Sequence, residues 1–373
     1  MSVVALAQEL VRLDTVNPPG QEEAAARLAI DRLTAAGLSV DVIELAPGRP
    51  NVVARWPGDG DAPALCLTGH LDTVPFGQAS WSREPLGAEV DGDRLYGRGT
   101  SDMKGGVAAV LVAAEAAAAA GRGRAGLEVV LCAGEETGCE GALALAGADG
   151  ALGRVGAVLV AEPTANVPCV AHKGVVWLEA VALGRTAHGS MPELGDNAVA
   201  KLARGIVALD GFAFEGVEAH ALLGSPTLNV GRVAGGMNVN SVPDRAVAGL
   251  DVRTVPELSC ADVVDALRAV MGEDVALEPW LDLPPIDTDP DDGWVRSVFA
   301  VMGERLDCTV EARGLAYFTD AAALSPAYGS PPTIICGPGE AAQAHQTDES
   351  CSVAALEVAA GGFTEIARRW CGV

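Results

Sequence analysis

The chain has 373 residues, of which 49% are hydrophobic and 20% are charged, and its formal net charge is −25 at pH 7. This composition is typical of a folded globular protein, and the length favours two domains over one. Because a strongly acidic chain repels phosphate backbones, the charge argues against nucleic acid as a partner.

The cysteines and the apolar segments of the sequence indicate where in the cell the protein is expected. Nine cysteines are scattered without a CxxC pair, which predicts reduced thiols and a cytoplasmic location. The N-terminal segment has no basic start, and Gln8 and Glu9 interrupt its apolar run, which argues against a signal peptide. The alanine-rich stretch 105–120 contains Glu115 and is shorter than a membrane span. We therefore expect a buried helix there and no membrane partner.

The first half of the chain alternates between helical and strand patterns. Helices are predicted at 3–14, 21–36, 103–120 and 138–146, and strands at 38–45, 51–56, 64–69, 127–132 and 157–160. This alternation favours an α/β layer built on a largely parallel sheet.

The middle of the chain has a different pattern. It predicts a strand at 173–183, a helix at 196–209, strands at 226–233 and 244–253, a helix at 259–271 and a strand at 274–280. This βαββαβ order is that of a ferredoxin-like sandwich, which can form a complete small domain. The segment 174–181 could pair edge to edge with its copy in a second chain, so we expect a homodimer through this domain.

The first pattern resumes after Pro284 and Pro285 and an Asp-rich stretch. It predicts a helix at 293–305, strands at 308–311 and 333–336, and a final helix at 350–369. We therefore predict an α/β domain formed by 1–172 and 284–373, with an α+β domain inserted at 173–283.

Imidazole and carboxylate side chains follow the ends of several predicted strands. These side chains are His70 after the strand at 64–69, Glu135 and Glu136 after 127–132, Glu162 after 157–160, and His345 after 333–336. Asp102 lies at the start of the helix predicted at 103–120. Because the carboxyl ends of parallel strands open on one edge of a sheet, we expect these groups to meet there.

Imidazole and carboxylate donors without thiolates suit Zn²⁺, Co²⁺ or Mn²⁺. Two histidines and three carboxylates exceed the ligands of one tetrahedral zinc, but they fit two ions if one carboxylate is shared. Two metals about 3.5–4 Å apart can hold an attacking water, lower its pKa to about 7 and polarise a carbonyl.

Each donor also has an ordinary structural interpretation. His70 and His345 could be structural histidines, and the pair Glu135 and Glu136 could lie in a solvated loop. Asp102 could cap the helix that follows it. Only the occurrence of all these groups together, in order and at strand ends, favours a metal site.

Five motifs together resemble those of the M20 metallopeptidases, a group that includes acetylornithine deacetylase and succinyl-diaminopimelate desuccinylase. The motifs are GHxDxVP from Gly69, GRGxxDMKG from Gly97, GEE from Gly134, AEPT from Ala161 and AHxxDE from Ala344. The resemblance covers essentially the whole chain. It implies a zinc-peptidase-like mixed sheet with helices on both faces, plus a ferredoxin-like lid and dimerisation domain.

The resemblance also implies roles for the residues of the main domain. The implied ligands of two divalent metal ions, zinc or alternatively cobalt or manganese, are His70, Asp102, Glu136, Glu162 and His345. Asp102 would bridge both ions, with His70 and Glu162 completing one site and the other two ligands completing the second. Glu135 would be the general base, and Asp72 would orient the His70 ring, as carboxylates often do for ligating histidines.

Three further residues are implied in the inserted domain. His188 would reach the active site of a partner subunit and stabilise an oxyanion, and Asn240 would lie near the same substrate group. Arg253 would bind a substrate carboxylate, a task that suits a planar guanidinium. Alternatively, these residues are a surface histidine, a turn residue and the partner of a neighbouring acid. His172 and His220 lie in no motif and are expected to be structural.

The predicted function is hydrolysis of the amide bond of a small N-acylated amino acid or short peptide by a metal-bridging water that Glu135 activates. Two alternatives stay open. One is a dipeptidase or carboxypeptidase that uses the same site, and the other is a metal-free binding protein on the same scaffold. The sequence fixes neither the acyl group nor the amino acid.

Overall fold

The computed structural model describes residues 1–373, which divide into two compact units. Unit 1 contains residues 1–171, 287–313 and 319–373, and unit 2 contains residues 172–286 and 314–318. Unit 2 begins one residue before the predicted insertion and ends three residues after it. The added segment 314–318 has no signal in the sequence pattern.

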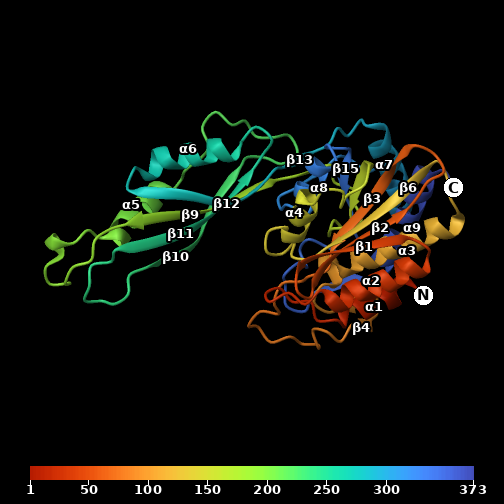
Figure 1. Ribbon diagram of the computed structural model, residues 1–373, viewed down its shortest axis with the longest axis horizontal. Coiled ribbons are helices and arrows are strands. Elements are labelled where there is room, and N and C mark those ends of the chain that lie inside the picture. Colours follow the sequence, from red (N-terminus) through yellow and green to blue (C-terminus); the bar gives the residue numbers. More distant parts are fainter. The chain divides into compact units, whose positions relative to one another are not determined.

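Unit 1 is built on a six-stranded sheet with the order β1-β2-β6-β3-β7-β15 (Figure 1). Its strands are β1 (Ser39–Ala46), β2 (Arg49–Trp56), β3 (Ala62–His70), β6 (Ala125–Cys132), β7 (Val155–Val160) and β15 (Thr333–Ile335). The last four run parallel to one another, whereas β2 is antiparallel to both of its neighbours, β1 and β6. All eight residues of β6 are buried, including Glu128, and a strand that is otherwise apolar suits a position covered on both faces.

Helices pack around this sheet in two groups. The first consists of α1 (Val3–Val11), α2 (Glu23–Ala35), α3 (Gly105–Ala120), α7 (Gly293–Leu306) and α9 (Val353–Cys371), which contact one another. The second consists of α4 (Glu140–Gly147) and α8 (Ala321–Ala327), which contact each other. Together, α4 and α8 also contact strands β1, β2 and β7. The mixed sheet covered by helices confirms the predicted fold class.

Helix α3 is the central helix of unit 1. The segment Thr100–Ala120, which is α3 with the preceding turn, is long and apolar enough to cross a membrane. However, 72% of its apolar stretch is buried inside the structure. The first turn of α3 lies against the end of β7, where a Cβ atom on Gly106 would come within 2.0 Å of the Ala161 oxygen. The expected buried helix is present and begins at Gly105 rather than at 103.

Unit 2 contains a four-stranded antiparallel sheet with the order β10-β11-β9-β12. Its strands are β9 (Gly174–Leu183), β10 (Thr227–Gly235), β11 (Arg245–Thr254) and β12 (Val275–Leu283), and its helices are α5 (Ala198–Ala208) and α6 (Cys260–Met271). Strand β9 is hydrogen-bonded on both sides, so the expectation that it pairs with its copy in a second chain is wrong. The free edges belong to β10 and β12.

Short elements account for the other differences from the sequence expectations. Two small sheets have the orders β16-β5-β4 (Ser350–Ser352, Arg94–Tyr96, Glu89–Asp91) and β13-β8-β14 (Ile286–Asp287, Ala171–His172, Gly314–Leu315). No strand forms at 308–311, because this largely exposed stretch has no strand partner. The last helix begins at Val353 rather than at 350, and the Ser352 hydroxyl caps it by accepting from the Ala355 amide at 3.0 Å.

Candidate metal centre

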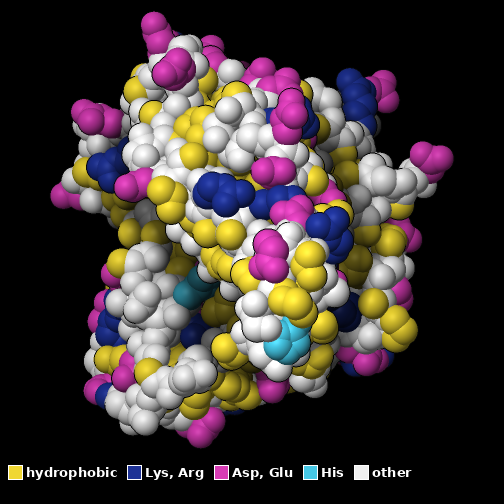
Figure 2. All heavy atoms as spheres, turned by 90° about the vertical axis from the view of Figure 1, so that its left-hand side faces the viewer, with side chains coloured by type: hydrophobic (Ala, Val, Ile, Leu, Met, Phe, Trp, Pro, Cys, Tyr) yellow, Lys and Arg dark blue, Asp and Glu magenta, His cyan; other side chains and the backbone are white.

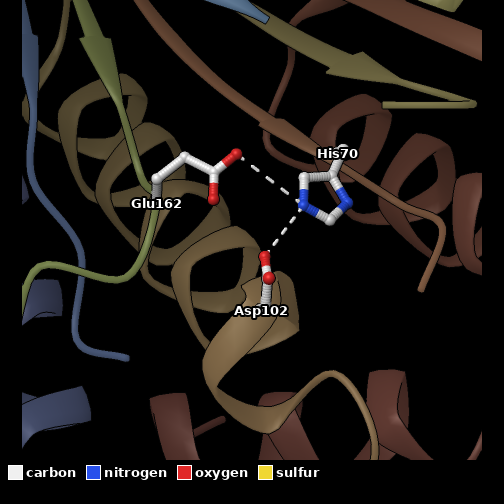
Figure 3. A group of neighbouring side chains, drawn as sticks. All are labelled: His70, Asp102 and Glu162. Atoms are coloured by element: carbon white, nitrogen blue, oxygen red, sulfur yellow. Dashed lines mark hydrogen bonds and ion pairs between the residues drawn. The ribbon is translucent and has the colours of Figure 1, made fainter. Parts of the chain in front are cut away.

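His70 ends strand β3 and is fully buried. Its Nε2 lies 3.2 Å from Asp102 Oδ1 and 3.7 Å from Glu162 Oε1, and both carboxylates point toward this nitrogen (Figure 3). Glu162 comes two residues after β7, which pairs with β3 in parallel. Neighbouring strand ends thus bring His70 and Glu162 together, as the parallel sheet predicted.

A second group of donors faces the other oxygen of Asp102. His345 Nε2 lies 3.4 Å from Asp102 Oδ2 and 3.0 Å from Glu136 Oε2. The two groups are His70, Asp102 and Glu162, and Asp102, Glu136 and His345, and within each the ligand atoms lie within 4.8 Å of one another. The structure therefore brings the five predicted ligands together in the two sets that the resemblance implies, with Asp102 common to both.

The backbone at Asp102 does not continue helix α3. Asp102 has φ −124° and ψ 94°, and the helix begins three residues later without a side-chain cap. The helix-cap interpretation of Asp102 is therefore wrong. The preceding Gly99 has a φ of 83°, a left-handed conformation that glycine adopts without strain.

Asp72 is fully buried and holds both His70 and the glutamate pair. His70 Nδ1 donates to the Asp72 carbonyl at 2.9 Å, which leaves Nε2 free for a cation, and the Asp72 carboxylate lies 3.5 Å from Nδ1. The same carboxylate accepts from the main-chain amides of Glu135 at 3.1 Å and Glu136 at 3.2 Å. Asp72 thus orients the ring mainly through its carbonyl and positions the glutamates through its side chain.

Asn17 is a supporting residue that the sequence analysis missed. Its Nδ2 donates to Asp72 Oδ2 at 2.8 Å and to Thr137 Oγ1 at 3.0 Å. Asn17 precedes Asp72 by 55 residues in an irregular segment, so no local pattern connects the two.

The electrostatics of the cluster fit divalent cations. Burial raises the pKa values of Glu135 and Glu162 well above the usual range and that of Glu136 to about 7. Burial opposes ionisation of Asp102, but hydrogen bonds from His345 and His70 outweigh it and lower its pKa. Glu136 Oε1 is buried without a hydrogen-bond partner. Crowded buried carboxylates with an unpartnered oxygen are what an oxygen- and nitrogen-ligated cation would neutralise.

In unit 2, the segments that carry His188 and Asn240 are hydrogen-bonded to each other. The Gly189 amide donates to the Asn240 carbonyl at 2.7 Å, and both predicted site residues are exposed. His188 Nδ1 accepts from the Ser190 amide at 3.2 Å and lies 2.8 Å from its hydroxyl. Because a main-chain amide only donates, the ring proton of a neutral His188 is on Nε2.

Arg253 is paired within unit 2. Its Nε and Nη2 donate to the two oxygens of Asp251 at 2.7 and 2.9 Å, and its guanidinium lies 5.1 Å from the centre of the Phe318 ring. His172 is buried, its Nδ1 donates to the Lys173 carbonyl at 2.9 Å, and burial lowers its pKa to about 4. His172 is therefore a neutral core residue, as expected.

An α/β domain with two groups of oxygen and nitrogen donors beside a buried glutamate defines a metal-dependent hydrolase. The sequence model of peptidase family M20/M25/M40 matches residues 66–369, and the chain belongs to this family. The protein is thus an M20 metallohydrolase, and the resemblance seen in its motifs is confirmed.

Individual relatives cover most of the chain. Acetylornithine deacetylase from Vibrio atlanticus (strain LGP32) is 32% identical over 342 residues, which cover 90% of this chain and 88% of the relative. A probable succinyl-diaminopimelate desuccinylase from Staphylococcus epidermidis (strain ATCC 12228) is 30% identical over 380 residues, covering 93% and 92%. The crystal structure of the M20 family metallo-carboxypeptidase Sso-CP2 from Sulfolobus solfataricus matches all of both chains with a TM-score of 0.83 and 19% identity, which shows the shared fold.

Proposed function

We propose that the protein hydrolyses the amide bond of N-acylated amino acids with two divalent metal ions, zinc or alternatively cobalt or manganese. The observation that carries this proposal is the placement of the two Asp102 oxygens toward separate donor groups, next to the buried Glu135. The named deacetylase and desuccinylase relatives support an N-acyl substrate over a peptide.

In this proposal the bound ions supply a water of lowered pKa and polarise the substrate carbonyl. Glu135 takes the proton from the attacking water and delivers it to the departing amine as the C–N bond breaks. Burial raises the pKa of Glu135, which suits a group that holds a proton between the two steps. The hydrogen bond from the Glu135 amide to Asp72 keeps this residue in place.

Residues of unit 2 are proposed to complete the site. His188 of one subunit would donate from Nε2 to the oxyanion in a partner subunit, and its exposed loop and the tautomer set by Ser190 support this role. Asn240, bonded to the same loop, would lie near the same substrate group. Arg253 would bind the substrate carboxylate with the N–H groups that Asp251 leaves unused.

A homodimer through unit 2 is supported by the surface around β10 and α5. Strand β10 is a free edge, Val233 on it is 60% exposed, and Val207 on α5 is 73% exposed. A groove between these elements is lined by Ile206, Val207, Leu209, Asp210, Leu228 and Val230. A second copy would bury this apolar surface and pair the edge strand.

The surroundings proposed for the enzyme follow from its thiols and charge. All nine cysteines are free, and seven are buried, which supports a cytoplasmic location. Acidic side chains are spread over the face shown in Figure 2, in keeping with the net charge of −25. This charge supports a small-molecule substrate rather than nucleic acid, with no membrane partner.

Metal analysis and a substrate panel together test this function. We expect about two equivalents of zinc per chain, as a paired-metal site requires. We also expect a higher kcat/KM for N-acetyl and N-succinyl amino acids than for dipeptides or longer peptides. Faster hydrolysis of the peptides would favour the dipeptidase or carboxypeptidase alternative. Failure to bind metal supplied in excess would favour a binding protein.

Replacing His188 with alanine should lower kcat by about 10²- to 10³-fold without loss of metal, because one oxyanion donor is removed. Mixing this variant with Glu135→Gln tests the partner role. In an equal mixture, half of the dimers contain one subunit of each variant. One of the two sites in each mixed dimer then has both Glu135 and His188. Activity should therefore return to about a quarter of the wild-type value.

His220→Ala in the same unit is the control for the His188 variant and should keep wild-type kcat. A loss of metal in His188→Ala would contradict the assigned role. The same holds if mixed dimers form without any gain in activity, since His188 would then act within its own subunit or not at all.

A further inference from the structure

Glu349 is fully buried, and four hydrogen bonds converge on its carboxylate. Oε1 accepts from the main-chain amides of Ser101 at 2.8 Å and Asp102 at 3.0 Å. Oε2 accepts from the amide of Gly99 at 2.9 Å and from Arg98 Nη1 at 2.8 Å. These donors fill the four lone-pair positions that an ionised carboxylate offers. The residue closes the AHxxDE motif, yet no role follows for it from the sequence.

Three of these donors belong to the backbone that carries Asp102. This loop is not helical at Asp102, so its buried amides need an acceptor other than a helical carbonyl. Glu349 supplies that acceptor, and its own carbonyl also accepts from the Gly97 amide at 2.9 Å. The direction of the Asp102 side chain therefore depends on the Glu349 carboxylate.

Arg98 extends this contact to the other loops of the centre. Its side chain is 2% exposed, and besides Glu349 it donates to the Gln346 carbonyl at 3.2 Å and to the Pro75 carbonyl at 3.1 Å. Gln346 follows His345, and Pro75 ends the motif that contains His70. The buried pair thus joins the segments that carry His70, Asp102 and His345.

We propose that Glu349 is a positioning residue of the metal centre. Its carboxylate fixes the loop conformation in which the two oxygens of Asp102 face different donor groups. The four hydrogen bonds go to main-chain amides and to Arg98, so Glu349 acts through the backbone and not on a metal-ligating atom. This inference rests on the proposed role of Asp102 as the shared ligand.

Glu349→Gln tests the proposal because it preserves volume but turns one acceptor oxygen into a donor that faces two donors. We expect the affinity for zinc, measured by competition with a chromophoric chelator, to fall by about 10- to 100-fold. The visible absorption spectrum of the cobalt-loaded protein should also change, because it reports ligand geometry. Neither readout would move if Glu349 only stabilised the fold.

Glu128→Gln is the matched control. Glu128 is also buried, and its carboxylate accepts from Arg55 Nε at 2.6 Å, Tyr328 Oη at 2.6 Å and the Gly153 amide at 3.0 Å. It lies four residues before the end of β6, or about 13 Å from the edge that carries the ligands. We expect lower thermal stability in this variant but wild-type zinc affinity and an unchanged cobalt spectrum.

Arg98→Lys is a second variant, which tests the same proposal if Glu349→Gln does not fold. Lysine keeps the charge but lacks the planar guanidinium group that donates to Glu349, Gln346 and Pro75 together. We therefore expect a loss of zinc affinity that is smaller than in Glu349→Gln. The proposal would be overturned if Glu349→Gln, or Arg98→Lys in its place, folded with wild-type zinc affinity and an unchanged cobalt spectrum. An equal loss of zinc affinity in Glu128→Gln would overturn it too. A wild-type protein that binds no metal would instead contradict the proposed function, before any variant is compared.

Discussion

Replacing Glu135 with glutamine should lower kcat by about 10²- to 10⁴-fold while two metal ions stay bound. Glutamine matches glutamate in size but cannot accept the proton of the attacking water. The residue is not among the two donor groups, so the ligands are unchanged. Steady-state kinetics on the best substrate of the panel, combined with metal analysis of the same sample, measure both quantities.

The pH dependence sharpens the Glu135 test. The base accepts a proton only when it is ionised, so wild-type kcat/KM should fall toward acid pH. Burial raises the pKa of Glu135, whereas bound cations would lower it, and in Glu135→Gln this titration disappears. Glu140→Gln is the matched control, because Glu140 is a nearby carboxylate that pairs with Arg49 at 3.0 Å. Near-normal turnover in Glu135→Gln would contradict its role as the base.

The convergence of the ligands could be predicted because strand ends are visible in the sequence. Strands β3, β6 and β7 are apolar runs with buried interiors, and their ends fall close to where the runs stop. The rule that parallel strands end at one edge then places His70, Glu136 and Glu162 together without knowledge of the strand order.

The supports of the site could not be predicted in this way. Glu349 reaches amides about 250 residues earlier in the chain, and no local sequence pattern predicts such a contact.

The position of a strand within its sheet could not be predicted either. Whether β9 lies inside or at the edge of its sheet depends on pairing, since an alternating strand looks the same in both positions. The pair of Arg253 and Asp251 is different, because residues two apart on a strand share a face. That spacing was a usable signal for the ion pair.

The strand expected at 308–311 shows the limit of local propensity. Thr309 and Val310 favour extended structure, but in the folded protein this stretch is mostly exposed and no strand lies beside it. The neighbouring strand β14 forms at Gly314–Leu315 because the chain there pairs with β8. Tertiary pairing, rather than residue type, decides which short segment becomes a strand.

Asp102→Asn should lower both metal content and activity, because its two oxygens face different donor groups. An amide keeps one oxygen and replaces the other with an NH₂ group that cannot coordinate a cation. We expect at least one metal equivalent to be lost. Metal ions contribute several kcal/mol to such reactions, so kcat/KM should fall by roughly 10³-fold or more. Metal analysis and kinetics in excess zinc measure both effects.

Asp292→Asn is the control that separates a ligand from a helix cap. Asp292 caps helix α7 by accepting from the amides of Trp294 at 2.8 Å and Val295 at 3.2 Å. Asparagine caps as well as aspartate, so this variant should keep wild-type stability, metal content and activity. If Asp102→Asn behaved in the same way, the two donor groups would not share a ligand. A two-metal mechanism at this edge of the sheet would then have to be abandoned.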